Sequence, residues 1–286
     1  MPLSFFKKLF EKPSAQIHSR DKVVKEQMQK GKQPSTIQAN NSSNSSLFKL
    51  DIFNSYLSQE EAKCPYCLEK LEKPPTRKRK CPHCKETMYG RTLPVIKRKV
   101  VVTEKQRNKV DQYNLIVSEL EMYGNDYIKK YREIKNDLKS KWGFEPEDRD
   151  VFWQLINKYR INMASSKAWG LYRNATHRMA EFLALEGKLE SSLDLYIEVH
   201  YIDTNGAGNS GQFHNDETTS EYNFSDLAPA LVAKTLDIKE QLNLTDEEFK
   251  DRYIKISSIT KQSLQFPIES KKSWFKFEKE MKSFKD

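Results

Sequence analysis

The sequence predicts a mostly α-helical protein: a small β module held by four cysteines, followed by an irregular helical bundle. Four cysteines occur only as two closely spaced pairs within residues 64–84, which predicts a compact module at residues 47–102. After residue 103, apolar side chains recur at helical spacing, which predicts a helical domain at 103–286. Residues 13–46 are rich in Lys, Gln, Ser and Asn, which predicts a disordered N-terminal linker.

Residues 1–12 are predicted to form a short amphipathic helix, with Leu3, Phe6, Leu9 and Phe10 on one face. The segment is too short and too polar for a secretory signal peptide. We expect it to dock on the protein or on a partner; contact with an anionic membrane surface is the weaker alternative. No apolar run approaches the roughly 20 residues that span a bilayer. The expected location is the cytoplasm, where thiols stay reduced.

The two cysteine pairs have the spacing of a metal site. They are Cys64-Pro-Tyr-Cys67 and Cys81-Pro-His-Cys84, separated by residues 68–80. A two-residue gap lets one turn aim two thiolates at one ion, so two turns complete a tetrahedral shell. All four corners are then protein ligands, and no position is open for water or substrate. The sequence therefore predicts one structural Zn²⁺ on these four cysteines.

Three other interpretations of the cysteines compete with structural zinc. Iron binds in the same thiolate cage, because the donor set alone does not separate it from zinc. Cys-Pro-Tyr-Cys is similar to the glutaredoxin active-site motif, but that chemistry needs a buried strand before the motif and a helix after it, and Pro74-Pro75 stops a helix. Disulfides require an oxidising compartment.

Residues 63–102 resemble the zinc-ribbon superfamily. The resemblance rests on both Cys-Pro-x-Cys knuckles and on the strand-like residues Thr87–Tyr89 and Val95–Val102. It implies a small β-ribbon on structural zinc, in a family whose members bind DNA, RNA or protein. The family usually has glycine after each second cysteine, where φ is often positive. Leu68 and Lys85 stand there in this chain, which predicts slightly opened knuckles.

The positive charge of the chain is concentrated near the cysteines. The whole chain carries +9, and Lys63–Lys99 alone holds twelve Lys and Arg against three Glu. Basic clusters on a small rigid module suit phosphate backbones, although only Tyr66 and Tyr89 offer rings for base stacking. The candidate nucleic-acid contacts form two runs: Arg77, Lys78, Arg79 and Lys80, then Lys97, Arg98 and Lys99.

The helical domain is predicted from capping signals and periodicity. One long helix is expected from Thr103 to about Lys141, with Gly124 as its weak point, and a second after Pro146. Further helices are expected at 164–186, at 189–202, near Ser225, after Thr245 and after Pro267. Residues 204–222 are predicted to form a flexible loop.

The third and fourth predicted helices weakly resemble a tetratricopeptide-like hairpin at 164–203. The resemblance is carried by Ala180, Phe182, Leu183, Gly187 and Tyr196. No 34-residue repeat accompanies it, so a plain helical bundle is the prediction.

No second chemical motif emerges. His177 and Glu181 lie one helical turn apart, and His200 and Asp203 lie near another helix end, but no HExxH, G-x-S-x-G or phosphate-loop pattern is present. The leading hypothesis is a non-enzymatic zinc-ribbon adaptor, with a basic ribbon surface and a helical domain that binds protein. A protein that binds DNA or RNA directly through the ribbon is the alternative. An enzyme with an unrecognised site in the helical domain is the second alternative.

Overall fold

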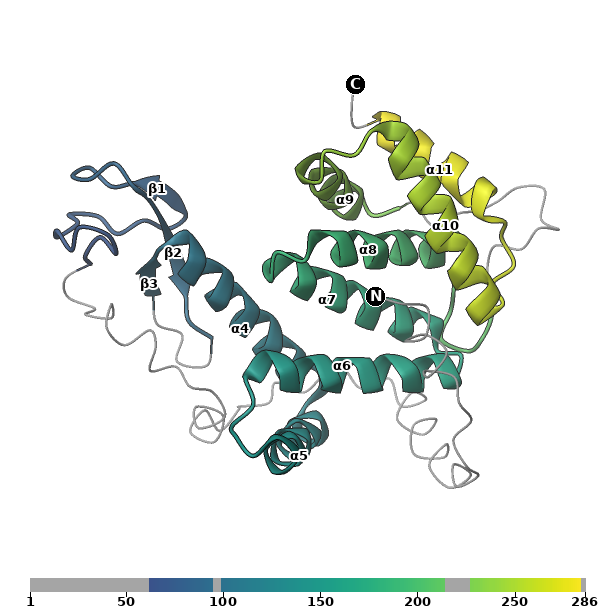
Figure 1. Cartoon of the computed structure of the whole chain (residues 1–286), viewed down its shortest axis with the longest axis horizontal. Coiled ribbons are helices and arrows are strands. Elements are labelled where there is room, and N and C mark those ends of the chain that lie inside the picture. The colour runs from purple at the N-terminus through teal and green to yellow at the C-terminus, as the bar shows by residue number, and fades with distance from the viewer. Residues whose placement is uncertain (1–61, 95–98, 214–226, 284–286) are drawn as a thin grey trace, which may run out of the picture. The chain divides into compact units, whose positions relative to one another are not determined.

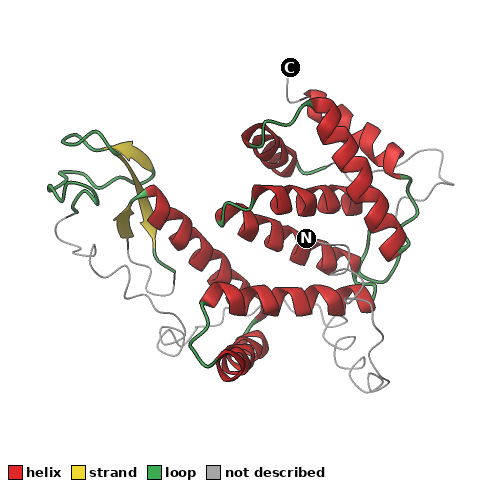
Figure 2. Cartoon of the chain, in the orientation of Figure 1, coloured by secondary structure: helices red, strands yellow, loops and turns green. Residues whose placement is uncertain are grey.

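The computed structural model describes residues 62–94, 99–213 and 227–283, and the structural statements below concern these residues. Within them the protein has eight helices and one three-stranded antiparallel sheet (Figures 1 and 2). This confirms the predicted fold class. The predicted helix at 1–12, the predicted linker at 13–46, Lys97, Arg98 and residues 214–222 of the predicted loop lie outside the described residues.

The sheet consists of β1 (Lys78–Lys80), β2 (Thr87–Thr92) and β3 (Lys99–Val102), with β2 in the centre. Tyr89 of β2 lies opposite Lys78 on one side and Val102 on the other. Because side chains alternate along a strand, Tyr89 and Val102 share one face, while Met88 and Val101 share the other. The second face carries the cysteines, since Met88 and Val101 belong to the same buried cluster as Cys64 and Cys81.

The helix predicted from Thr103 to about Lys141 is two helices, α4 (Glu104–Tyr123) and α5 (Asn125–Trp142). The predicted capping box at Thr103 is present: its hydroxyl accepts from the N–H of Gln106, and its own N–H donates to the Gln106 side chain. The break falls at Gly124, whose φ of 73° suits glycine and whose N–H donates to the carbonyl of Leu120.

The other helices form a bundle around α8. They are α6 (Asp148–Ser165), α7 (Trp169–Leu185), α8 (Leu189–Thr204), α9 (Pro229–Gln241), α10 (Asp246–Leu264) and α11 (Ser270–Ser283). α7 and α8 form a hairpin that turns at Gly187 (φ 75°), and α9, α10 and α11 also contact α8 (Figure 1). The main core lies between these helices, and Tyr196, Phe249 and Phe277 are among its buried side chains. No described helix has the length and apolar content needed to cross a bilayer.

The sheet packs against α4 through its non-cysteine face. The Tyr89 hydroxyl donates to Glu104 (3.2 Å), and the Arg107 guanidinium lies over the Tyr89 ring. Arg91 binds both carboxylate oxygens of Asp111 at 2.8 and 3.2 Å. These contacts connect the cysteine module to the first helix of the helical domain.

Candidate metal centre

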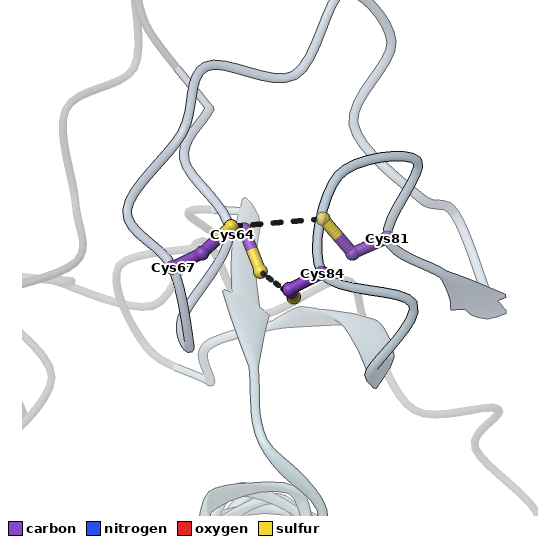
Figure 3. A group of neighbouring side chains, drawn as sticks. All are labelled: Cys64, Cys67, Cys81 and Cys84. Carbon is purple, nitrogen blue, oxygen red and sulfur yellow. Dashed lines mark hydrogen bonds between the residues drawn. The ribbon is translucent and has the colours of Figure 1, made fainter.

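The four cysteine sulfurs lie at the separations expected of ligands on one ion. All four Sγ atoms are within 4.8 Å of one another, with Cys64 and Cys84 at 3.7 Å and Cys67 and Cys81 at 3.8 Å (Figure 3). Four thiolates about 2.3 Å from a tetrahedral zinc ion are about 3.8 Å apart. A disulfide would hold two sulfurs at about 2.05 Å. The geometry therefore fits a shared metal ion, as the cysteine spacing predicts, and is consistent with a zinc ribbon.

The two knuckles have the same backbone geometry. The N–H of Leu68 donates to the carbonyl of Cys64 (3.0 Å), and the N–H of Lys85 donates to that of Cys81 (3.1 Å). Both closing residues have positive φ, 62° for Leu68 and 65° for Lys85. The prediction of opened knuckles is therefore wrong. The turn that brings each cysteine pair together requires this conformation, so non-glycine residues adopt it at a cost of roughly 1–2 kcal/mol each.

The pKa values of the Cys64 and Cys81 thiols are shifted in opposite directions. Burial raises the pKa of the Cys64 thiol to about 12. Burial also opposes ionisation of Cys81, but the backbone N–H groups of Cys84 and His83 point at its sulfur and lower its pKa to about 6. Four thiolates so close together repel one another, and a divalent cation removes that repulsion. The donor set thus suits a metal that binds thiolates.

A small apolar core covers the cysteines. Leu71, Met88 and Val101 are buried and pack against them; Cys64 and Cys81 are buried, whereas Cys67 and Cys84 are partly exposed. Gly90 allows the backbone at Pro75 to lie directly against β2, because a Cβ atom on residue 90 would lie 1.8 Å from the carbonyl oxygen of Pro75. The segment before β1 therefore crosses the cysteine face of the sheet in direct contact with β2.

The basic candidates do not form one patch. Lys78, Arg79 and Lys80 make up β1, and Arg77 precedes it; all four are exposed. We call Arg77–Lys80 the basic run. Lys99 lies in β3, at the other edge of the sheet, opposite Thr92 at the far end of β2. The structure therefore separates Lys99 from the basic run, and Lys97 and Arg98 lie outside the described residues.

The basic run has no acidic partner among the described residues. Within the described residues its one side-chain hydrogen bond runs from the Arg79 guanidinium to the carbonyl of Lys73 (3.3 Å). In the helical domain, by contrast, Arg160, Arg173 and Arg178 each pair with a carboxylate at 2.7 Å or less. The basic run thus keeps its charge available to a partner.

The histidine pairs considered from sequence are largely structural. His177 lies 3.8 Å from Glu181, which also binds Arg178 at 2.7 Å, and burial lowers the pKa of His177. His200 and Asp203 are not brought together: His200 lies 2.9 Å from the Thr235 hydroxyl, whereas Asp203 binds Arg173. Neither arrangement holds three metal ligands around an open position.

A buried ionic group between α6, α7 and α8 has no counterpart among the sequence-based predictions. Arg160 is buried and donates to both carboxylate oxygens of Glu198, at 2.6 and 2.7 Å. It also donates to the hydroxyls of Tyr172 (2.6 Å) and Thr176 (2.9 Å). These partners lie on α7 and α8, at least 12 positions from Arg160 in the sequence, so no local pattern predicts the group. Its polar atoms satisfy one another, which indicates a structural role.

Comparisons with protein-family models, with curated proteins and with solved structures found no match to this chain.

Proposed function

We propose that zinc occupies the four-cysteine centre and that the protein is a non-enzymatic adaptor. The metal braces the ribbon, the basic run binds an anionic partner, and the helical domain binds protein. The observation that carries this proposal is that the exposed basic run, which has no ion pair within the described residues, is followed directly by Cys81, the first candidate ligand of the second knuckle.

Zinc suits the centre because four cysteine sulfurs lie within 4.8 Å of one another and, as thiolates, would complete a closed tetrahedral shell. Bound zinc holds the two knuckles together, and structural sites of this kind contribute about 10–16 kcal/mol to folding. A module of about 40 residues buries too little apolar surface to be stable without such support. The chain's own groups position the sulfurs: backbone N–H groups donate to Cys64 and Cys81, and Met88 and Val101 pack against the cysteines.

The basic run suits a contact surface because it is exposed and, within the described residues, has no ion-pair partner, its one side-chain hydrogen bond being from Arg79 to the Lys73 carbonyl. Surface charges act over roughly 8–10 Å at physiological ionic strength, so four adjacent cations attract anionic groups before contact. Most guanidinium groups of α6, α7 and α10 are instead neutralised within the fold, as in the pair of Arg252 with Asp194. Anionic partners are therefore expected at the ribbon rather than at these helices.

The test has two parts, of which the first is metal analysis. Protein purified without added metal should contain one zinc per chain. Substoichiometric zinc with reduced thiols, or iron in its place, would contradict the zinc proposal.

The second part is capture of partners from the native host. The ribbon-neutral variant carries glutamine at the basic run: Arg77→Gln, Lys78→Gln, Arg79→Gln and Lys80→Gln. The matched control loses the same charge from exposed helical positions: Lys129→Gln, Arg132→Gln, Lys255→Gln and Lys279→Gln. Wild type and control should retain a common set of partners, and the ribbon-neutral variant should lose part of it. Identical capture by all three proteins would refute a contact role for the basic run.

Direct nucleic-acid binding is the second candidate, favoured by the exposed Tyr66 ring on the first knuckle of a module that also carries the basic run. Its signature is an electrophoretic shift of DNA or RNA that weakens steeply with salt, because released counterions drive such binding. No shift at low salt would exclude it.

A further inference from the structure

We propose that the open edge of β1 binds an acidic, extended peptide segment by strand addition. This rests on the proposed function, because it names the partner class for the basic run. β1 is an edge strand: the sheet order is β1-β2-β3, and β1 pairs only with β2 among the described residues (Figure 1). An exposed edge strand offers unpaired backbone groups to another chain.

The hydrogen-bond register shows which backbone groups are available. The N–H of Gly90 donates to the carbonyl of Arg77 (2.8 Å), and at the other end of the hairpin the N–H of Cys81 donates to the carbonyl of Glu86 (2.8 Å). Hydrogen-bonded and non-hydrogen-bonded pairs alternate along an antiparallel ladder. Lys78 and Lys80 therefore occupy the non-hydrogen-bonded positions, and their N–H and C=O groups point away from β2. These groups are the ones an added strand would pair with.

The basic side chains lie on both faces of this edge. Arg79 lies opposite Met88, on the cysteine face, and Arg77 shares that face because side chains alternate along the strand. Lys78 lies opposite Tyr89, on the face toward α4, and Lys80 shares that face. A strand added at the edge would also alternate its side chains, so carboxylates on consecutive residues would meet cations above and below the sheet.

This two-faced arrangement favours a peptide over nucleic acid. A phosphate backbone lying on one face of the sheet would reach only two of the four cations at once. The charges also select against a second copy of this chain, because two edges of the same sequence would repel each other. An acidic peptide in extended conformation uses both the free backbone groups and all four charges.

The test uses the zinc-loaded full chain and a fluorescein-labelled peptide with four consecutive glutamates flanked by threonines. A control peptide has the same sequence with every glutamate amide N-methylated, which keeps the charge and removes the hydrogen-bond donors. Fluorescence anisotropy should show at least about tenfold tighter binding of the unmethylated peptide, as expected when two or more hydrogen bonds are lost. Equal binding of the two peptides would overturn strand addition.

Two protein variants separate backbone from charge. Lys78→Gln removes one cation and keeps the outward N–H, whereas Lys78→Pro removes both, and proline is tolerated on an edge strand at a position whose N–H is not in the ladder. Lys78→Pro should bind the peptide about fivefold more weakly than Lys78→Gln, the effect of one hydrogen bond. Equal affinities of the two variants, with zinc content unchanged, would contradict the proposal.

Amide hydrogen exchange provides an independent readout. Bound peptide should slow exchange at Lys78 and Lys80, whose N–H groups face outward, and leave β3 unchanged. If a thymidine oligonucleotide instead displaces the peptide and binds without slowing these amides, the basic run is a phosphate site and strand addition is wrong. If the peptide fails to bind but the ribbon-neutral variant still loses host partners, the proposed adaptor function stands and only this inference fails.

Discussion

The buried His200 should make folding stability depend on pH in a measurable way. Its ring is fully buried on α8, with Nε2 2.9 Å from the Thr235 hydroxyl and the ring centroid 4.7 Å from that of Phe277, the two rings being tilted by 60°. Nδ1 has no hydrogen-bond partner within the described part of the chain. Burial, followed by the nearby positive charge of Arg173, lowers the pKa of His200 from 6.5 to about 3.

The sign of the effect follows from the direction of this pKa shift. The unfolded chain takes up a proton on His200 below about pH 6.5, whereas the folded chain does so only near pH 3. The stability contribution is therefore complete above pH 6.5 and is lost as the pH falls toward 3. A pH of about 5.0 lies about 1.5 units below the pKa of the unfolded histidine. Protonation of the unfolded chain therefore lowers the free energy of unfolding by about 2 kcal/mol at this pH.

The assay compares urea unfolding of wild type and His200→Gln, followed by far-UV circular dichroism. Glutamine does not titrate, and its amide can still bond to Thr235. Between about pH 7.5 and about pH 5.0, the stability difference should shift by about 2 kcal/mol in favour of the variant. Groups common to both proteins, the cysteines included, cancel in this difference. A stability difference that is the same at both pH values would refute the reasoning.

Three further predictions concern the metal centre and the buried ion pair. Cys81→Ser should abolish zinc binding and unfold the ribbon while far-UV circular dichroism of the helices persists; loss of that signal would mean that ribbon and helices fold as one unit. Gly90→Ala should accelerate zinc release to a chromogenic chelator, because its Cβ would lie 1.8 Å from the Pro75 carbonyl oxygen; wild-type release kinetics would show that the close approach is unimportant. Glu198→Gln should lower the unfolding free energy by roughly 3–5 kcal/mol in urea, because it leaves the Arg160 charge buried without a counterion. Adding Arg160→Met should recover part of that loss, and no recovery would argue against uncompensated charge as the cause.

Much of the candidate metal centre could be predicted because its determinants are local. A two-residue gap between cysteines leaves the chain few ways to place both thiols, so Cys64 with Cys67 and Cys81 with Cys84 were identified from spacing alone. The helices could be predicted for the same reason, because apolar periodicity depends only on residues three or four positions apart. The capping box at Thr103 also needs only residues three positions apart.

Other features depend on residues that are distant in sequence. Asp203 is close to His200 along the chain, yet it binds Arg173, because the packing of α7 on α8 decides which side chains meet. Arg160 and Glu198 are separated by 38 positions, and only the bundle brings them together. The break at Gly124 is similar: glycine permits the turn, but the two helices must also find separate packing partners.

The sequence by itself determined the fold class, the four metal-ligand candidates and the location of the positive charge, since these rest on residue type and short-range spacing. Only the tertiary structure decided how that charge is presented. Pairing of β1 with β2 places Lys78 and Arg79 on opposite faces and turns the backbone groups of Lys78 and Lys80 outward. Pairing of β3 moves Lys99 to the opposite edge. The physical reason is that strand register depends on contacts across the sheet, which no local pattern in one strand specifies.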